Sequence, residues 1–410
     1  MKIIPELRFP EFKNEGEWQQ NVVSQVADYE NGKAHEQDID EEGKYVVVNS
    51  KFISTDGEVR KFSNSANCIA KKNDVLMVLS DVPNGRAIAK CFYVDKDDLY
   101  TVNQRICKLT PATADSRILY YLLNRNSYFL SFDDGVKQTN LRNEDVQNCP
   151  IILPRNPQEQ QKIASCLSSL DEVIAAHSKK LDLLKDHKKG LMQNLFPQEG
   201  ETVPKYRFKE FENDGEWELK PFSEYIKLYR GSSPRPIIEY QTQDEKGVNW
   251  IKIGDTSTVT DYVIRSVSEK ITRKGAEKSR VVKKGELILA NSMSYGSTYL
   301  LDIEGCIYDG WFVLREYDEV LDKQFLLQLL NSEYMQNQYK RLAAGGIVQN
   351  ISSEIVYSTL VPKTTLPEQQ KIASCLSSLD TLITAQAEKI EQLQLHKKGL
   401  MQGLFPKIND

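Results

Sequence analysis

A chain of 410 residues is long enough for two or three domains, each with its own hydrophobic core. The hydrophobic content of 40% and charged content of 27% are ordinary for a soluble globular protein, and no apolar run is long enough to span a bilayer. The net charge of −5 excludes a uniformly basic surface, although a basic face can coexist with acidic surfaces elsewhere.

The chain begins MKIIPELRFPEF, which lacks the basic, apolar and small-residue sections of a signal peptide, so we expect a cytoplasmic protein with no membrane contact. The seven cysteines contain no CxxC pair and the four histidines are scattered. We therefore expect neither a disulfide framework nor a metal site.

Residues 1–155 have the pattern of a mixed α/β domain. Short apolar runs predict strands at 44–50, 74–80 and 86–94, and a helix is predicted at 116–132, whose aromatic residues we assign to the core. The loops between them carry side chains of the types that read base edges. The candidate DNA-binding residues are Asn84, Arg86, Asn103, Gln104, Arg105, Lys137, Gln138, Asn140 and Arg142.

Residues 156–197 predict one long helix, with prolines at its entry and exit and none inside. Apolar residues recur at alternating steps of four and three, which is the pattern of a coiled-coil seam. The predicted seam residues are Ile163, Leu167, Leu170, Ile174, His177, Leu181 and Leu184.

Residues 198–363 predict a second mixed α/β domain, with strands at 248–254 and 286–292 and a helix at 322–342. The stretch 271–284 holds six basic residues and one acidic residue, which suits phosphate contacts. The candidate DNA-binding residues here are Arg230, Ser232, Ser233, Arg235, Arg273, Lys274, Lys278, Arg280, Ser292, Ser294, Tyr295, Gln349 and Asn350.

Residues 364–410 repeat the long helix. Between 158–197 and 367–406, 27 of 40 positions are identical, including EQQKIASCLSSLD in full. The predicted seam continues through Ile372, Leu376, Leu379, Ile383, Gln386, Ile390 and Leu393. We expect the two helices to pair in an antiparallel coiled coil within the chain, with His177 and Gln386 close together as a polar layer. The fold class is therefore two α/β (α+β) domains joined by this coiled coil, in a tandem pseudo-twofold repeat.

Many polar residues of the two helices are also identical. They form either a solvated face that has not diverged or a docking surface used twice, for two copies of one partner. The candidate docking residues are Gln160, Gln161, Lys162, Ser165, Ser168, Ser169, His187, Lys188, Lys189 and Gln193, with Gln369, Gln370, Lys371, Ser374, Ser377, Ser378, His396, Lys397, Lys398 and Gln402 in the second copy.

Several catalytic signatures are missing from the sequence. There is no GxxxxGK[ST] phosphate loop, no Asn/Asp-Pro-Pro-aromatic tetrapeptide and no glycine-rich cofactor turn between a strand and a helix. We therefore assign no catalytic residues and expect a protein that is not an enzyme by itself.

The order of variable region, helix, variable region and helix, with the string P-x-EQ-x-KIA-x-x-L-x-x-LD and the ending KKGLMQxLF, resembles the specificity subunit of type I restriction–modification systems. The strings RGSSPRP and GxxxQNIS are similar to text of its target recognition domains. The resemblance implies that each variable region reads one half of a split, asymmetric site in double-stranded DNA, and that the paired helices set the gap between the halves.

The resemblance also implies the partners, in a bacterial or archaeal cytoplasm. Two methylation subunits dock on the helices and hold S-adenosylmethionine, and restriction subunits supply an ATP- and Mg-dependent translocase and nuclease. This chain carries no cofactor and is required for the methyltransferase and endonuclease activities of the complex.

Two alternatives remain open. The chain could be a coiled-coil scaffold that presents two divergent binding modules and binds no DNA, which the net negative charge favours mildly. It could also be a self-sufficient methyltransferase or nuclease, although the missing motifs count against that.

Overall fold

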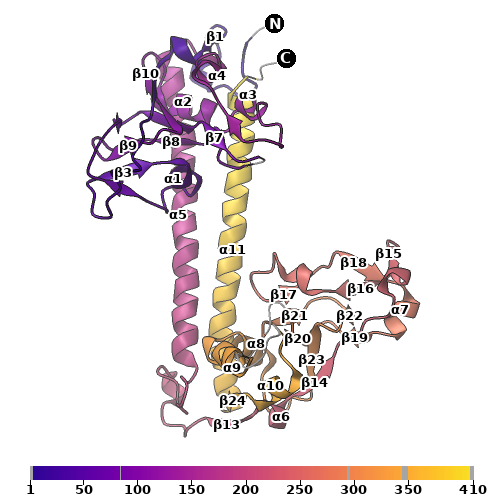
Figure 1. Cartoon of the computed structure of the whole chain (residues 1–410). Coiled ribbons are helices and arrows are strands. Elements are labelled where there is room, and N and C mark those ends of the chain that lie inside the picture. The colour runs from indigo at the N-terminus through magenta and orange to yellow at the C-terminus, as the bar shows by residue number, and fades with distance from the viewer. Residues whose placement is uncertain (1–2, 84, 293–295, 344–349, 407–410) are drawn as a thin grey trace. The chain divides into compact units, whose positions relative to one another are not determined.

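The computed structural model describes residues 3–83, 85–292, 296–343 and 350–406 (Figure 1). The chain divides into two compact units: unit 1 comprises residues 1–176 and 390–410, and unit 2 comprises residues 177–389. Each unit is a mixture of helices and strands, as the sequence predicts. The two long helices, α5 (Pro157–Leu195) and α11 (Leu366–Leu404), each contribute one part to each unit. The four-part division by domain and helix stays a prediction.

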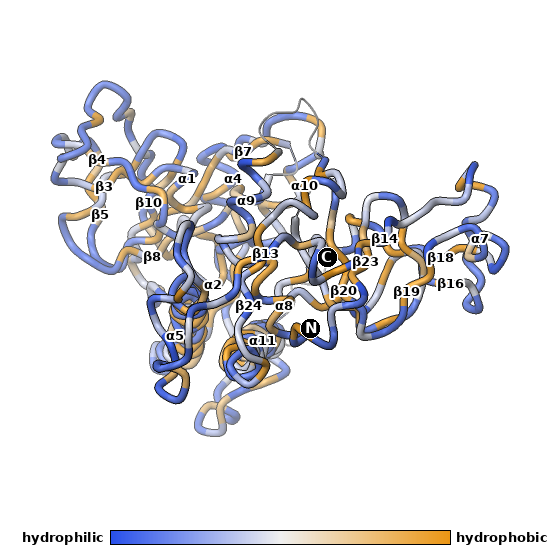
Figure 2. Tube along the Cα trace, turned by 90° about the horizontal axis from the view of Figure 1, so that it is seen from below, coloured by the Kyte–Doolittle hydropathy of each residue, from blue (hydrophilic) through white to orange (hydrophobic). Residues whose placement is uncertain are grey.

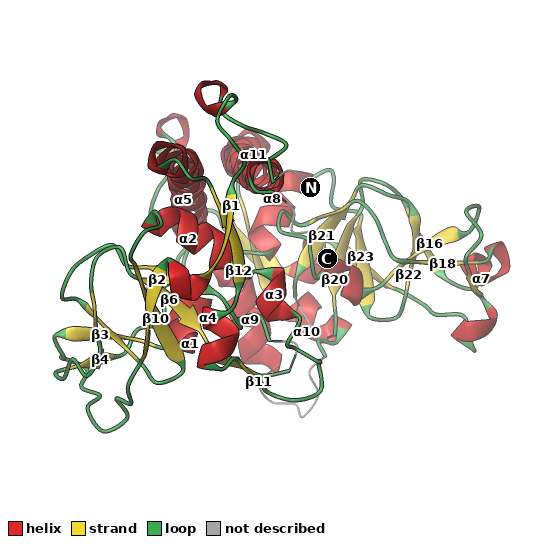
Figure 3. Ribbon diagram, turned by 90° about the horizontal axis from the view of Figure 1, so that it is seen from above, coloured by secondary structure: helices red, strands yellow, loops and turns green. Residues whose placement is uncertain are grey.

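Unit 1 contains two four-stranded sheets, with strand orders β2-β10-β6-β8 and β4-β3-β9-β5, and the two-stranded pairs β1-β12 and β11-β7. Its elements are η1 (Pro10–Phe12), β1 (Gln19–Val22), η2 (Val23–Gln25), β2 (Ala27–Asn31), β3 (Tyr45–Val48), α1 (Ser50–Ser54), β4 (Phe62–Ser63), β5 (Ile69–Ala70), β6 (Val75–Val78), β7 (Ser80–Asp81), β8 (Cys91–Tyr93), β9 (Tyr100–Val102), β10 (Ile106–Pro111), α2 (Ser116–Leu123), α3 (Ser127–Leu130), β11 (Thr139–Asn140), α4 (Asn143–Gln147) and β12 (Pro150–Leu153). Figure 3 shows α2 between α5 and the strands β2, β6 and β10.

Unit 2 contains two five-stranded sheets, with strand orders β14-β23-β20-β21-β17 and β15-β18-β16-β22-β19, and the pair β13-β24. Its elements are η3 (Lys209–Phe211), β13 (Glu218–Pro221), α6 (Phe222–Tyr225), β14 (Lys227–Arg230), η4 (Ile237–Glu239), β15 (Gln241–Thr242), β16 (Val248–Ile251), η5 (Ile253–Thr256), β17 (Val263–Ile264), β18 (Glu269–Ile271), α7 (Arg273–Glu277), β19 (Arg280–Val282), β20 (Leu287–Ala290), β21 (Thr298–Leu301), β22 (Gly305–Ile307), β23 (Trp311–Arg315), α8 (Lys323–Leu330), α9 (Glu333–Ala343), α10 (Ser353–Ser358) and β24 (Leu360–Lys363).

The predicted strands form where continuous apolar runs are buried on both faces. All four residues of β6 and all four of β20 are buried, and β20 is among the hydrophobic segments in Figure 2. The predicted strand at 86–94 is shorter in the structure, because Ala89 has a φ of 53° and only Cys91–Tyr93 remain extended. The predicted strand at 248–254 ends at Ile251, where a short 3-10 helix replaces it.

In each unit the helix predicted from the sequence is interrupted at an asparagine whose side chain accepts a hydrogen bond from a strand. The helix at 116–132 is split into α2 and α3, and Asn124 Oδ1 accepts a hydrogen bond from the backbone N–H of Cys91 at 3.0 Å. The helix at 322–342 is split into α8 and α9, and Asn331 Oδ1 accepts from Thr298 N–H at 3.0 Å. Each strand N–H group thereby gains a hydrogen-bond acceptor, and the helix ends directly before the asparagine.

The residues predicted for the seam are covered in part by the core of each unit: Ile163 and Leu167 belong to the core of unit 1, and Ile372 and Leu376 to that of unit 2. Each of the fourteen seam residues is buried or half-buried, whereas neighbours such as Leu183, Leu382 and Leu395 are exposed. In unit 2 the helices run antiparallel. The Gln386 side-chain amide lies 2.7 Å from Nδ1 of His177 and donates to the His177 carbonyl at 2.8 Å.

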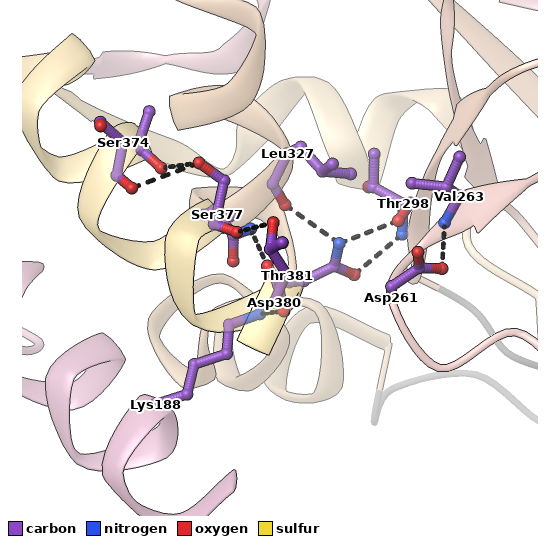
Figure 4. Close-up of polar contacts among 12 residues, drawn as sticks. Lys188, Asp261, Val263, Thr298, Leu327, Ser374, Ser377, Asp380 and Thr381 are labelled. Atoms are coloured by element: carbon purple, nitrogen blue, oxygen red, sulfur yellow. Dashed lines mark hydrogen bonds and ion pairs between the residues drawn. The ribbon is translucent and has the colours of Figure 1, made fainter. Parts of the chain in front are cut away.

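The same ion pair joins the two helices in each unit. In unit 2, Lys188 Nζ lies 2.6 Å from Asp380 Oδ1 (Figure 4). Gln328 of α8 donates to the other carboxylate oxygen at 2.9 Å. In unit 1, Lys397 Nζ lies 2.5 Å from Asp171, which also accepts from the Tyr121 hydroxyl of α2. The repeated lysine and aspartate thereby connect the helix pair to the α/β part of each unit.

An arm before the first strand of each unit is anchored on the start of a long helix. In unit 1, Arg8 binds Glu159 through Nε and Nη2 at 2.7 and 2.8 Å, and both side chains are nearly inaccessible. In unit 2, Arg207 binds Glu368 at the same two distances. The hydrogen bonds that each arginine donates to its glutamate are the main cause that raises the pKa of Arg8 and of Arg207.

The β13–β24 pair of unit 2 is expected to weaken in acid. Hydrogen bonds from Lys220, Lys363 and Tyr225 lower the pKa of Glu218 from an ordinary value near 4.5 to about 2. Because this pKa is depressed in the folded state, the stabilisation is complete above about 4.5 and is lost as the pH falls towards 2. Hydrogen exchange of residues 218–221 and 360–363 should show this loss, and Glu218→Gln should abolish its pH dependence.

Unit 1 provides the control for that experiment. Gln19 pairs with Leu153 at the position where Glu218 pairs with Lys363, and a glutamine does not titrate. Protection of the β1–β12 amides, measured in the same samples, corrects for the pH dependence of intrinsic exchange. Equal loss of protection in both strand pairs between pH 4.5 and 2 would contradict the prediction.

No helix in the described part of the chain combines the length and apolar character needed to cross a membrane. The described residues also form no group of three or more His, Cys, Asp or Glu side chains that could hold a metal ion. The seven cysteines are free thiols, and burial raises the pKa of Cys68 to about 11 and that of Cys107 to about 12.

Candidate nucleic-acid interface

In unit 1 the predicted DNA-binding loops converge on β7. Strand β11 pairs with β7, with Asn140 opposite Ser80, and Gln138 Nε2 donates to Ser80 Oγ at 2.6 Å. Asp81 accepts from the backbone N–H groups of residues 87 and 88 at 2.6 and 3.1 Å, and so closes the loop that carries Arg86. The backbone N–H of Leu79, directly before β7, donates to the carbonyl of Arg105 at 2.9 Å, so three loops that are distant in sequence meet here.

A polar cavity of about 380 Å³ lies beside these loops in unit 1. Asn103, Gln104 and Arg105 form part of its wall, and the Gln104 amide donates to Glu36 at 2.9 Å. The rest of the lining is His35, Glu36, Ile39, Val47, Asn49, Ser50, Lys51 and Lys61. Amide and cationic groups in one concave place suit hydrogen bonding to a polar ligand edge.

In unit 2 the predicted residues gather around Asp309, in the turn between β22 and β23. Ser233 Oγ donates to Asp309 Oδ1 at 2.5 Å, and Arg235 lies 4.0 Å from Oδ2. The backbone carbonyl of Asp309 accepts from Arg230 at 3.3 Å and from Asn291 at 3.0 Å. The hydrogen bond from Ser233, with the charges of Arg235 and Arg230, lowers the pKa of Asp309, which therefore acts only as an acceptor.

Two further cations border this cluster. Arg280 donates from Nε to the Arg230 carbonyl at 3.1 Å, and Ser232 Oγ donates to the Lys278 carbonyl at 3.3 Å. Lys278 Nζ is 2.5 Å from the Tyr240 hydroxyl, and this contact is the main cause that raises the Lys278 pKa. The result is a patch of permanent positive charge, in contrast to the net charge of the chain.

The predicted DNA-binding residues differ in exposure. Exposed are Arg86, Gln104, Arg105, Lys137, Gln138, Asn140, Arg142, Arg230, Arg235, Arg273, Lys274, Lys278 and Asn350. Half-buried are Asn103, Ser232, Ser233, Arg280 and Ser292. Asn84, Ser294, Tyr295 and Gln349 lie outside the described residues. Ser292 and Asn350 form an isolated antiparallel bridge, in the place that Ser80 and Asn140 have in unit 1.

Six of the predicted docking residues are not exposed: Gln160, Ser168, Lys188 and Gln369 are buried, and Ser377 and Lys397 are half-buried. Gln160 and Gln369 each accept from the N–H of the N-cap aspartate before α2 or α8 at 2.8 Å. Lys188 and Lys397 form the ion pairs between the helices. The identity of these four residues in the two copies follows from internal contacts and not from a shared partner.

Other repeated residues keep an exposed position. The exposed set is Gln161, Lys162, Ser165, Ser169, His187, Lys189, Gln193, Gln370, Lys371, Ser374, Ser378, His396, Lys398 and Gln402. Lys162 and Lys371 contact Glu11 and Glu210 of the arms, which also explains their repetition.

The sequence did not single out Asp309, Asn49, Lys51 or Lys61. Asp309 lies in no string with a recognisable pattern, and its place beside the arginines depends on the pairing of β14 with β23. One sequence signal was available: residues 103–105 were already candidates in unit 1. A search for the corresponding turn in the second half of the chain could have led to Asp309.

Two segments, residues 15–186 and 215–395, match the family model described as the type I restriction modification DNA specificity domain. Because they cover most of the chain, the chain belongs to this family. Its members are specificity subunits of type I restriction systems and are not catalytic themselves.

Similar proteins agree with this assignment. The type I restriction enzyme MjaVIII specificity subunit of Methanocaldococcus jannaschii is 26% identical over 97% of this chain and 93% of its own length. The S subunit of a type I restriction–modification system from M. genitalium has a TM-score of 0.64 at 16% identity over all of both chains. A second structure, on complex assembly and conformational transition of the type I R-M system, has a TM-score of 0.57 at 18% identity over 95% of this chain and 97% of that one. At these identities the structures establish the fold.

Proposed function

We propose that this chain is the DNA-recognition subunit of a type I restriction–modification complex, and that each unit reads one half of a bipartite, asymmetric site in double-stranded DNA. The observation that carries the proposal is the cationic cluster around Asp309, which combines groups for phosphates with groups for base edges. In unit 1, the loops that carry Arg86, Arg105, Gln138 and Asn140 meet at β7, which supports the same role with different side chains.

In this proposal α5 and α11 form an antiparallel coiled coil that sets the gap between the half-sites, in a pseudo-twofold repeat. The seam burial and the Lys–Asp pair in each unit support it. The exposed repeated residues, among them Ser165, Ser169 and His187 on α5, dock one methylation subunit, and their copies on α11 dock a second. S-adenosylmethionine belongs to the methylation subunits, and ATP and Mg to the restriction subunits.

Methylation mapping tests this function. With the neighbouring methylation subunit, a host that expresses this chain should gain one bipartite methylated motif. Replacing residues 218–363 with the region of another family member should change one half of the motif and leave the other half and the gap intact. If no new motif appears although the complex assembles, the chain is a scaffold and not a reader.

Insertion of seven residues into both α5 and α11 tests the spacer. Two helical turns lengthen the helix pair by about 10 Å, or roughly three base pairs. The gap should increase with the same bases read in both halves. An unchanged gap would contradict the role of the helices as a spacer.

A further inference from the structure

The turn between β9 and β10 of unit 1 and the turn between β22 and β23 of unit 2 occupy the same place. Gly32 N–H donates to the Ile106 carbonyl at 2.9 Å, and Gly231 N–H donates to the Trp311 carbonyl at 2.8 Å. On the other side, Leu79 N–H donates to the carbonyl of Arg105 at 2.9 Å, and Asn291 N–H donates to that of Gly310 at 2.9 Å. Two matching pairs of backbone hydrogen bonds therefore enclose the two turns.

Close packing fixes both turns further. A Cβ on Gly32 would lie 2.1 Å from the carbonyl oxygen of Asn103, and a Cβ on Gly231 would lie 1.9 Å from that of Tyr308. These distances are far below van der Waals contact, so any other residue at either glycine would displace the turn. The matching bonds and glycines align residues 103–105 with residues 308–310, and Gln104 with Asp309.

The side chains on this fixed frame are different. Unit 1 presents Asn-Gln-Arg and unit 2 presents Tyr-Asp-Gly. The neighbour four residues after the glycine changes with them: Gln104 donates to Glu36 in unit 1, whereas Asp309 lies beside Arg235 in unit 2. A constant backbone with paired substitutions is what a variable recognition element requires.

A carboxylate such as that of Asp309 is not expected in a surface that binds only phosphates. A carboxylate within a cationic patch repels phosphate, yet it is the group that accepts hydrogen bonds from an exocyclic base amine such as cytosine N4. Its Oδ1 accepts from Ser233, while Oδ2 lies 4.0 Å from Arg235, the nearest cation among the described residues, so Oδ2 has capacity for a further donor.

We infer that this turn is a specificity-determining element of each unit, an inference that rests on the proposed DNA-reading function. Asp309 accepts a hydrogen bond from an exocyclic amine in the half-site of unit 2. Gln104 and Arg105 read purine edges in the half-site of unit 1, as the amide and guanidinium geometries favour for adenine and guanine.

Selection of bound sequences from a randomised duplex library, with the full chain in complex with its methylation subunit, tests the inference. Asp309→Asn should relax or change the base at one position of the unit 2 half-site, by about 10- to 100-fold in relative affinity. Gln104→Asp should change one position of the other half-site and leave the unit 2 half-site as it was. Asp302→Asn is the control, because Asp302 is an exposed carboxylate of unit 2 that pairs with Lys284 outside the turn.

The outcomes separate the inference from the function on which it rests. If the unmodified complex selects no sequence, the proposed function fails. If the unmodified complex is selective and Asp309→Asn changes affinity equally for all sequences, the turn acts only through its charge and the inference is wrong. Retention of the original base preferences by both variants would also overturn it.

Discussion

Replacing Glu159 by glutamine is expected to destabilise unit 1 by about 3–5 kcal/mol, because it leaves the buried guanidinium of Arg8 without a counter-charge. The Arg8 side chain is 7% exposed, and its Nη1 already donates to the carbonyls of Glu15 and Gly16. Trp18 Nε1 loses charge assistance in its 3.2 Å hydrogen bond to the same carboxylate. The arm that precedes β1 should detach from α5 first.

Hydrogen exchange measured on peptides from residues 3–18 and 157–170 gives the local effect, and urea unfolding gives the change in free energy. The control is Lys162→Gln, which removes a half-exposed ion pair to Glu11 on the same two segments. That change should cost no more than about 1 kcal/mol. If Glu159→Gln is as mild as Lys162→Gln, the buried pair contributes little to the anchoring of the arm.

How much of this fold the sequence could predict depends on the range of the contacts. The seam of α5 and α11 is a local periodicity, so it could be predicted without knowledge of the rest of the chain. The break between α2 and α3 could not, because Asn124 leaves the helix to satisfy the N–H of Cys91, a strand residue distant in sequence. The strand at 86–94 was overestimated for a related reason: its apolar composition hid the turn at Ala89.

The repeated polar residues of the helices show a second limit of prediction from the sequence: identity between the copies does not say which contact each residue makes. Identity between the copies suggested an outward docking face, but Lys188 and Lys397 have the same partner type inside each unit. Two equal internal environments conserve a residue as effectively as two equal external partners. Asp309 shows the converse: a residue that differs between the halves has no repeated signal, and its role follows only from its contacts with Ser233 and Arg235 in the folded chain.

Removal of two exposed cations from the Asp309 cluster is expected to have the largest effect on DNA affinity. In the double variant Arg235→Ala with Lys278→Ala, the slope of log Kobs against log salt concentration should fall in magnitude by about 1.8, or 0.9 for each phosphate that is no longer neutralised. The same relation gives a decrease of roughly 50-fold in affinity at 0.1 M salt. Both side chains are exposed and contribute little to the core, so the fold should persist.

The matched control removes two cations from elsewhere in unit 2. Lys205 and Lys209 are exposed residues of the arm before β13, and the double variant Lys205→Ala with Lys209→Ala changes the net charge by the same amount. If DNA is held by the cluster, the control leaves the slope unchanged, because general attraction between distant charges is screened within about 10 Å at 0.1 M salt. Equal decreases in slope for both double variants would mean that net charge, and not the cluster around Asp309, determines the affinity.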